Sequence, residues 1–134
     1  MQAETHVYTD GSCLRNPGGP GGWAFAVLTP DTIWCVSGGD GATTNNRMEL
    51  QAVIETLMFL DTHNIIIHTD SKWVENCASG KWQKKANCDL WREYEALSQN
   101  RSIRFVWVKG HSGNTYNDLV DDLARSEAKK YKTF

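Results

Sequence analysis

The order of extended and helical segments in the sequence predicts an α/β protein with a mixed five-stranded sheet flanked by helices. Three extended runs come first, and helical and extended segments then alternate up to a final helix. Runs joined by short turns pair antiparallel, whereas strands separated by helices pair in parallel through right-handed crossovers. We therefore expect strands 1 to 3 to be antiparallel and strands 1, 4 and 5 to be parallel, within one domain spanning residues 1–134.

The N-terminal half is expected to supply three strands and one helix. Glycines and prolines mark a loop within it. Thr29-Pro30-Asp31 separates two apolar or alternating runs, which predicts a hairpin. Further on, apolar residues recur at helical spacing. In chain order, we expect a strand at 5–10, a loop at 11–22, strands at 23–28 and 32–37, and a helix from Asn45 to about Leu60.

The C-terminal half is expected to supply two more strands and three helices. A continuous β-branched run begins at Ile65, which is typical of a parallel strand buried on both faces. Ser71 can cap the helix after it, and Thr115 with Asp118 fits a capping box for the last helix. In chain order, we expect a strand at 65–69, a helix after Ser71, a helix from Asp89 to about Leu97, a strand at 103–108 and a helix at 115–130.

Composition limits the kinds of protein that this chain can be. The 134 residues suit one compact domain, and the net charge of -2 argues against a protein that holds nucleic acid through bulk positive charge. The polar N-terminus and the lack of any apolar run of roughly 18 residues predict a cytoplasmic location with no membrane partner. The four cysteines form no CxxC pair, so we expect reduced thiols and neither a zinc site nor a redox motif.

Four acidic residues are expected to converge on a metal site. Asp10 and Asp70 end strands that should be parallel neighbours, Glu49 lies beside the apolar stripe of its helix, and Asp121 lies on the last helix. Sites in α/β sheets lie at the carboxyl ends of strands, and hard cations such as Mg2+ prefer oxygen ligands. The alternative for each acid, taken singly, is a helix cap or a solvated surface position.

These acids lie in segments that together resemble ribonuclease H of type 1, in order from about Tyr8 to the last helix. The resemblance implies an endoribonuclease that hydrolyses the RNA strand of RNA/DNA hybrids and leaves 5′-phosphate and 3′-hydroxyl ends. It also implies two Mg2+ ions per active site, with Mn2+ as a substitute. The segments that carry the resemblance are Tyr8–Ser12, Thr43–Leu50, Ile65–Ser71, Lys109–Gly113 and the helix around Asp121.

His111 lies between glycines directly after a strand, where a histidine can hold or relay a proton near neutral pH. By resemblance it matches the family's catalytic histidine, since ten positions separate it from Asp121. The alternative is a loop histidine bonded to backbone. Asn117 shares a helical face with Asp121 and is expected to orient it.

Polar side chains near the acids suit a shallow minor groove, where amides and hydroxyls read sugar hydroxyls and phosphates. The alternative is that these asparagines only form turns or start a helix. The resemblance places two groups of residues on the substrate: Cys13, Asn16, Asn45 and Asn46 along the RNA strand, and Thr44 and Asn87 at a phosphate of the DNA strand.

The segment 80–85 mixes an aromatic residue with lysines, among them Lys84 and Lys85, which suits contact with a phosphate backbone. A solvated loop anchored by a tryptophan is the alternative. Many bacterial members of the family carry a longer basic insertion here, and this chain lacks most of it. The shorter segment argues against tight, processive binding and leaves the chemistry intact.

Three other functions stay open at this point. The chain could be a nuclease domain cut from a reverse transcriptase, which sequence upstream of Met1 would reveal. A hybrid-binding module without catalysis would require a missing acid, and all four are present. A structural calcium site would bind Ca2+ without phosphodiester cleavage. The expected state is a monomer that acts on an RNA/DNA hybrid.

Overall fold

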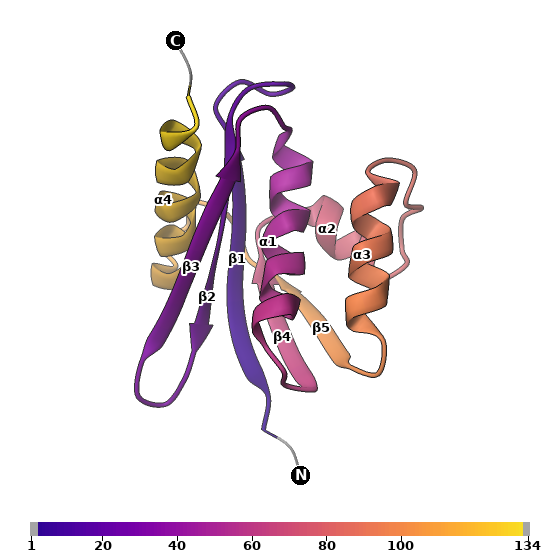
Figure 1. The fold of residues 1–134 in the computed structure, drawn as a ribbon. Helices are drawn as coiled ribbons and strands as arrows, with labels where there is room; N and C mark the ends of the chain where they lie inside the picture. Colours follow the sequence, from indigo (N-terminus) through magenta and orange to yellow (C-terminus); the bar gives the residue numbers. More distant parts are fainter. Residues whose placement is uncertain (1–2, 133–134) are drawn as a thin grey trace.

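A computed structural model describes residues 3–132 of the chain. Strands and helices alternate after an initial run of three strands, as the sequence predicts (Figure 1). In chain order, the elements are β1 (Thr5–Cys13), β2 (Gly21–Leu28), β3 (Ile33–Asp40), α1 (Asn45–Phe59), β4 (Asn64–Thr69), α2 (Lys72–Ala78), α3 (Cys88–Ser98), β5 (Ser102–Trp107) and α4 (Thr115–Lys130).

The five strands form one mixed sheet in the order β3-β2-β1-β4-β5. β1 pairs antiparallel with β2, and β2 pairs antiparallel with β3. β1 pairs in parallel with β4, and β4 pairs in parallel with β5. This arrangement confirms the mixed sheet expected from the order of the segments.

Helices cover both faces of the sheet, because alternate residues of each strand point to opposite sides. Val7 and Phe25 belong to the larger core, which also includes apolar residues of α1, α2 and α3. Tyr8 and Ala24 belong to a smaller core with residues of α4. Figure 1 shows α4 apart from α1, α2 and α3, with the sheet between them. The central strand β1 is therefore buried on both faces.

The predicted loop at 11–22 is wrong at both ends. β1 continues through Cys13 and β2 begins at Gly21, and the two strands stay paired there. Two glycines of this stretch, Gly11 and Gly22, serve close packing of helices against the strands. A Cβ atom at Gly11 would lie 2.3 Å from the backbone nitrogen of Glu49, and one at Gly22 would lie 2.1 Å from the carbonyl oxygen of Ala124.

The expected helix caps are right in one case and wrong in another. Ser71 caps α2, since its hydroxyl accepts a hydrogen bond from the Val74 backbone N–H at 3.1 Å. The capping box at Thr115 is absent, because the side chain of Asn114 accepts from the N–H groups of Tyr116 and Asn117 and is itself the cap. Thr115 is thus the first residue within the helix. An asparagine is as effective a cap as a threonine, so the local pattern fits either start.

Across residues 3–132, none of the helices combines the length and the apolar character that crossing a bilayer requires.

Candidate active site

Three carboxylates meet at one edge of the sheet. Asp10 lies in β1 and Asp70 directly follows β4, and the parallel register that pairs Tyr8 with His68 puts the two aspartates level with each other. Glu49 reaches them from the second turn of α1. One carboxylate oxygen from each of the three acids lies within 4.8 Å of the other two. We call Asp10, Glu49 and Asp70 the acidic cluster.

The backbone at Gly11 permits this close approach. A side chain at this position would collide with the start of α1 at Met48 and Glu49. Because Gly11 has none, α1 packs directly on β1 and carries Glu49 to the side of Asp10. Both acids are buried, with only 3% of Asp10 and 8% of Glu49 exposed.

Burial and neighbouring negative charges raise the pKa values of two acids of the acidic cluster. Burial, followed by the charge of Asp70, raises the pKa of Asp10 from 3.8 to about 8. Burial, followed by the charges of Asp10 and Asp70, raises the pKa of Glu49 well above its ordinary value. The Oε1 atom of Glu49 is buried and has no hydrogen-bond partner. A cation between these oxygens would relieve both the repulsion and the unsatisfied oxygen.

The donor set fits a hard divalent cation. It consists of carboxylate oxygens, with no thiol or imidazole in the acidic cluster. Oxygen ligands with room for water are what Mg2+, Mn2+ and Ca2+ prefer. The pocket around the acidic cluster, which we call the acidic pocket, is open and has a volume of about 380 Å³. Its wall includes Ser12 and Asn45. The acidic cluster can therefore bind a metal ion that stays accessible to a substrate.

Asp121 lines the same pocket but stands outside the acidic cluster. Its Oδ2 atom lies 2.9 Å from the Arg125 guanidinium, one turn further along α4, and 3.8 Å from Nδ1 of His111. Of the four acids expected to converge, three therefore place carboxylate oxygens within 4.8 Å of one another, and the fourth lines the same pocket and pairs with an arginine. Arg125 is not among the residues expected from the sequence, although its i,i+4 spacing from Asp121 was a usable signal.

His111 is at the rim of the pocket, in the turn between β5 and α4. Its side chain is 78% exposed, and its backbone is in the left-handed region with a φ of 55°. Nothing in residues 3–132 other than Asp121 forms an ion pair with its ring. The imidazole is thus free to approach a group bound at the acidic cluster.

Asn117, which is expected to orient Asp121, lies on the same helix as that acid. Among residues 3–132 it makes no side-chain hydrogen bond to that carboxylate, and its buried Oδ1 atom has no partner. It lies one helical turn before Asp121 and is 1% exposed. Sharing a helical face sets the direction of a side chain but does not create a hydrogen bond.

The polar residues expected to read the RNA strand lie at the junction of the loop after β1 and the start of α1. Asn16 accepts a hydrogen bond from the Asn45 N–H at 3.0 Å, so the loop is tied to the helix. Asn45 lines the acidic pocket, and Asn46 is exposed beside it. The Cys13 thiol lies 3.3 Å from the Arg15 carbonyl oxygen and bonds within the same loop.

The residues expected at the DNA strand surround Arg47. Thr44 caps α1 by accepting from the Arg47 N–H, and Asn87 accepts from the Arg47 guanidinium at 3.1 Å. The same guanidinium holds Asp89 through two hydrogen bonds of 3.0 and 2.8 Å. Arg47 therefore links Thr44 and Asn87, which are far apart in the chain, although it was not expected to be part of the site.

Lys84 and Lys85 differ in their surroundings. The amino group of Lys84 lies 5.3 Å from the centre of the Trp91 ring and 3.6 Å from a Glu95 carboxylate oxygen. Lys85 is exposed. Lys84 thus contributes to packing against α3, whereas Lys85 is directed to solvent.

The mixed sheet and the acidic cluster at its edge together define the class of protein. It is an α/β protein with an accessible cluster of carboxylates whose geometry suits a divalent metal ion.

Comparison with known proteins identifies the family. The profile of the RNase H family matches residues 2–129. The chain is 43% identical to a ribonuclease HI of Helicobacter pylori, covering 95% of this chain and 94% of that protein. It is 37% identical to a ribonuclease H of Chlorobium phaeovibrioides, covering 97% and 99%. The chain belongs to the RNase H family.

The fold agrees with this assignment. The structure superposes on the N-terminal RNase H domain of a Mycobacterium tuberculosis protein with a TM-score of 0.84 and 27% identity, covering 97% of this chain and 96% of that one. The RNase H-like fold and the family resemblance expected from the sequence are both confirmed. The small size of the chain, 134 residues, also fits a protein that lacks most of the basic insertion.

Proposed function

We propose that this protein hydrolyses the RNA strand of RNA/DNA hybrids and leaves 5′-phosphate and 3′-hydroxyl ends. Membership of the RNase H family supports the substrate class. The observation that carries the proposal is the acidic cluster, in which two of three acids are buried at the edge of the sheet and repel one another. Such an arrangement is costly to folding and is explained by a bound cation.

The metal is proposed to be Mg2+, with two ions per site and Mn2+ as a substitute. Asp10, Glu49 and Asp70 would hold the ions, and Asp121 would complete the ligand set once its ion pair with Arg125 opens. When bound, two such ions activate a water molecule and stabilise the leaving oxygen of an in-line displacement. The carboxylates of the chain fix where that displacement takes place.

His111 is proposed to move protons during turnover. Its exposed ring lies at the rim of the pocket beside Asp121, where it can accept or donate a proton at the departing 3′ oxygen. Asn117 is proposed to orient Asp121, which lies one turn further along α4. Neither residue is needed to hold the metal.

Substrate binding is proposed to use neutral polar groups around the acidic pocket. The hydrogen bond between Asn16 and Asn45 leaves the Asn16 amide group available for a sugar hydroxyl. Arg47 donates a hydrogen bond to the Asn87 side chain, which supports a role for Asn87 at a phosphate. The full proposed set is Cys13, Asn16, Asn45 and Asn46 at the RNA strand, Thr44 and Asn87 at the DNA strand, and Lys84 and Lys85 at the backbone.

We further propose that residues 1–134 act as a single domain, as a monomer, in the cytoplasm. The single mixed sheet that extends through the described residues supports one domain. Sedimentation of the purified chain tests the monomer. A stable dimer at micromolar concentration would refute it.

The substrate class is tested by incubating the protein with end-labelled RNA/DNA hybrid, duplex RNA and duplex DNA in Mg2+. We expect cleavage of the RNA strand in the hybrid alone, with fragments that a polymerase can extend from their 3′-hydroxyl ends. Equal cleavage of duplex DNA, or tight Ca2+ binding with no cleavage of any substrate, would overturn the proposal.

A further inference from the structure

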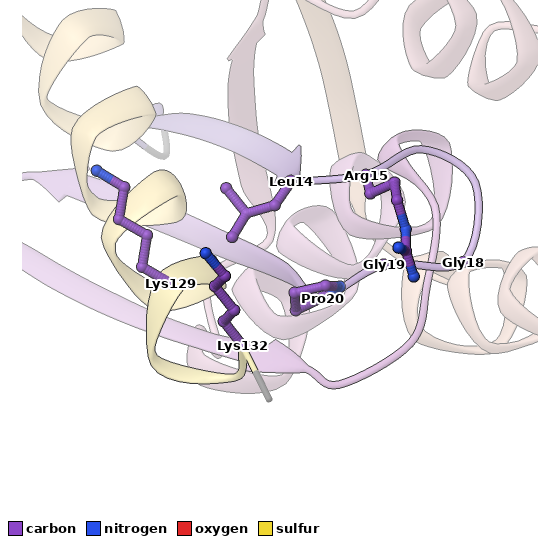
Figure 2. Close-up of a pocket in the computed structure, with 7 residues that line it drawn as sticks. All are labelled: Leu14, Arg15, Gly18, Gly19, Pro20, Lys129 and Lys132. Carbon is purple, nitrogen blue, oxygen red and sulfur yellow. The ribbon is translucent and has the colours of Figure 1, made fainter. Parts of the chain in front are cut away.

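A second pocket, with a volume of about 500 Å³, lies between the loop after β1 and the C-terminal end of α4 (Figure 2). The loop supplies Leu14, Arg15 and Pro20 to its wall, and the helix end supplies Lys129 and Lys132. Those of its lining residues that the structure describes carry three cationic side chains and no carboxylate. We call this the basic pocket.

The frame of the basic pocket is held by short contacts. In the loop, the Gly19 N–H donates to the Arg15 carbonyl oxygen at 2.7 Å, and a Cβ atom at Gly19 would lie 2.7 Å from that of Arg15. At the helix end, the Lys132 N–H donates to the Lys129 carbonyl oxygen at 3.3 Å, which keeps both lysines on the same turn. The backbone positions of the three cationic residues are therefore set by the fold, and their side chains are exposed.

Two of these cations have no anionic partner within the described chain. The side chains of Arg15 and Lys129 form no ion pair or hydrogen bond among residues 3–132, whereas the neighbouring Lys130 pairs with Glu127 at 3.1 Å. Lysines in a last helical turn offset the negative end of the helix dipole. That explanation does not apply to Arg15, which belongs to the loop on the other side of the pocket. Cations gathered in this way attract an anion.

The basic pocket continues the acidic pocket along two elements. On α4, Asp121 and Arg125 line the acidic pocket and Lys129 lines the basic pocket, each four residues after the last. Residues at this spacing share one helical face. Along β1 and its extension, Ser12 lines the acidic pocket and Leu14 lines the basic pocket. A strand of nucleic acid that leaves the acidic cluster can therefore follow this path.

We propose that the basic pocket binds a backbone phosphate of the nucleic acid that the acidic cluster cleaves. This proposal rests on the proposed function, and it adds a phosphate subsite on the α4 side of the molecule. From Asp121 to Lys129 the helix rises about 12 Å, at 1.5 Å per residue. That distance corresponds to about four steps of a duplex at 3.4 Å per step. The phosphate in question therefore lies about four nucleotides from the cleaved bond.

The test uses a fixed register and a charge-neutral probe. A DNA oligonucleotide with a short central RNA segment is paired with complementary DNA, so that cleavage can occur only in the segment. Single phosphates on each strand are replaced in turn by neutral methylphosphonates. Binding is measured without metal, to prevent cleavage, for the full chain and for the variant R15Q/K129Q/K132Q. Lys130→Gln serves as the control, since it removes one charge from the same turn outside the pocket.

We expect the triple variant to bind about 10-fold more weakly at low salt. The negative slope of its log affinity against log salt should be shallower by about one than that of the wild type. For the wild-type chain, one methylphosphonate about four nucleotides from the RNA segment should weaken binding. The same methylphosphonate should have no further effect on the triple variant. Lys130→Gln should bind as the wild type does. Lys129→Arg, which keeps the positive charge in the basic pocket, should also bind as the wild type does.

Two results would overturn the proposal. One is an unchanged affinity and salt slope in the triple variant, and the other is a methylphosphonate profile that is the same in both chains. Cleavage of the hybrid by the wild-type chain in Mg2+ is measured in parallel. If the wild type cleaves and the triple variant binds normally, the basic pocket is refuted while the proposed function stands. If the wild type does not cleave, the proposed function fails independently of the binding result.

Discussion

At the scale of single residues, the acidic cluster is an energetically unfavourable feature of the fold that points to its function. Asp10 and Glu49 are buried beside each other and beside Asp70, and their pKa values are raised for that reason. Burying these carboxylates side by side destabilises the metal-free fold, but the same oxygens suit a divalent cation. Stability in the absence of metal and activity in its presence should therefore respond in opposite directions to neutralisation of one acid.

Replacing Asp10 by asparagine should stabilise the metal-free protein at about pH 8, because it removes a buried charge at little change in volume. We expect Tm to rise by several degrees, since about 1 kcal/mol corresponds to roughly 3 to 6 °C in a domain of this size. Thermal unfolding in EDTA measures this difference. Asp61→Asn is a matched control, because Asp61 is exposed and lies outside the acidic cluster. A lower Tm for Asp10→Asn would contradict the account.

The stability of the metal-free wild type should fall as pH rises from about 4 to about 8. Between the ordinary pKa of 3.8 and the folded pKa of about 8, the folded protein keeps a proton on Asp10 that the unfolded chain has released. Glu49 acts in the same direction. Stability from this site is thus fully present below about pH 4 and is lost as pH approaches 8. Tm measured in EDTA across this range tests the sign, and a parallel fall in Asp10→Asn would assign the effect to other groups.

His111→Ala should lower turnover by about 10²-fold or more, the usual contribution of a general acid or base, and leave residual activity. Metal affinity should stay near that of the wild type, because His111 is exposed and stands outside the acidic cluster. Steady-state cleavage and titration with Mn2+, taken together, separate the two roles. Loss of metal binding in this variant would make His111 a ligand.

At the scale of elements, the sequence predicts the strands and helices well and the contacts between them less well. Helical spacing from Asn45 and the β-branched run from Ile65 are local signals, and both elements are present. Gly11 and Gly22 indicate a loop when they are considered locally, but they lie in paired strands beneath α1 and α4. Their role depends on residues that are distant in the chain, so spacing alone could not reveal it.

Gly22→Ala should destabilise the protein by about 1 to 3 kcal/mol, the usual cost of overpacking. The added Cβ atom would meet the Ala124 carbonyl oxygen and the Ala128 nitrogen, which belong to the backbone of α4 and cannot turn aside. Gly41→Ala is the control, because a Cβ atom there would meet nothing within 4 Å. Urea unfolding of the two variants gives the comparison. Similar stabilities would show that α4 can shift away from the sheet.

At the scale of the whole molecule, charge is distributed unevenly over a chain whose net charge is only -2. Acids gather at the acidic cluster, and cations gather at the basic pocket, which Lys129 lines two turns after Asp121 on α4. The four acids and His111 could be singled out from the sequence, because each lies in a distinctive segment. The basic pocket could not, since Arg15 and Lys129 meet only when the sheet and α4 are assembled. For the same reason, the pairing of Asp121 with Arg125 and the link through Arg47 became visible only in three dimensions.

The central claim is that the acidic cluster is a metal centre that cleaves the RNA strand of a hybrid. Its most direct test is the rate of RNA-strand cleavage against Mg2+ concentration for the wild type and for Asp10→Asn. We expect the wild-type rate to require Mg2+ and to saturate, and the rate of Asp10→Asn to be lower by orders of magnitude at every concentration while the variant stays folded. Cleavage by folded Asp10→Asn at a rate near that of the wild type would contradict the claim.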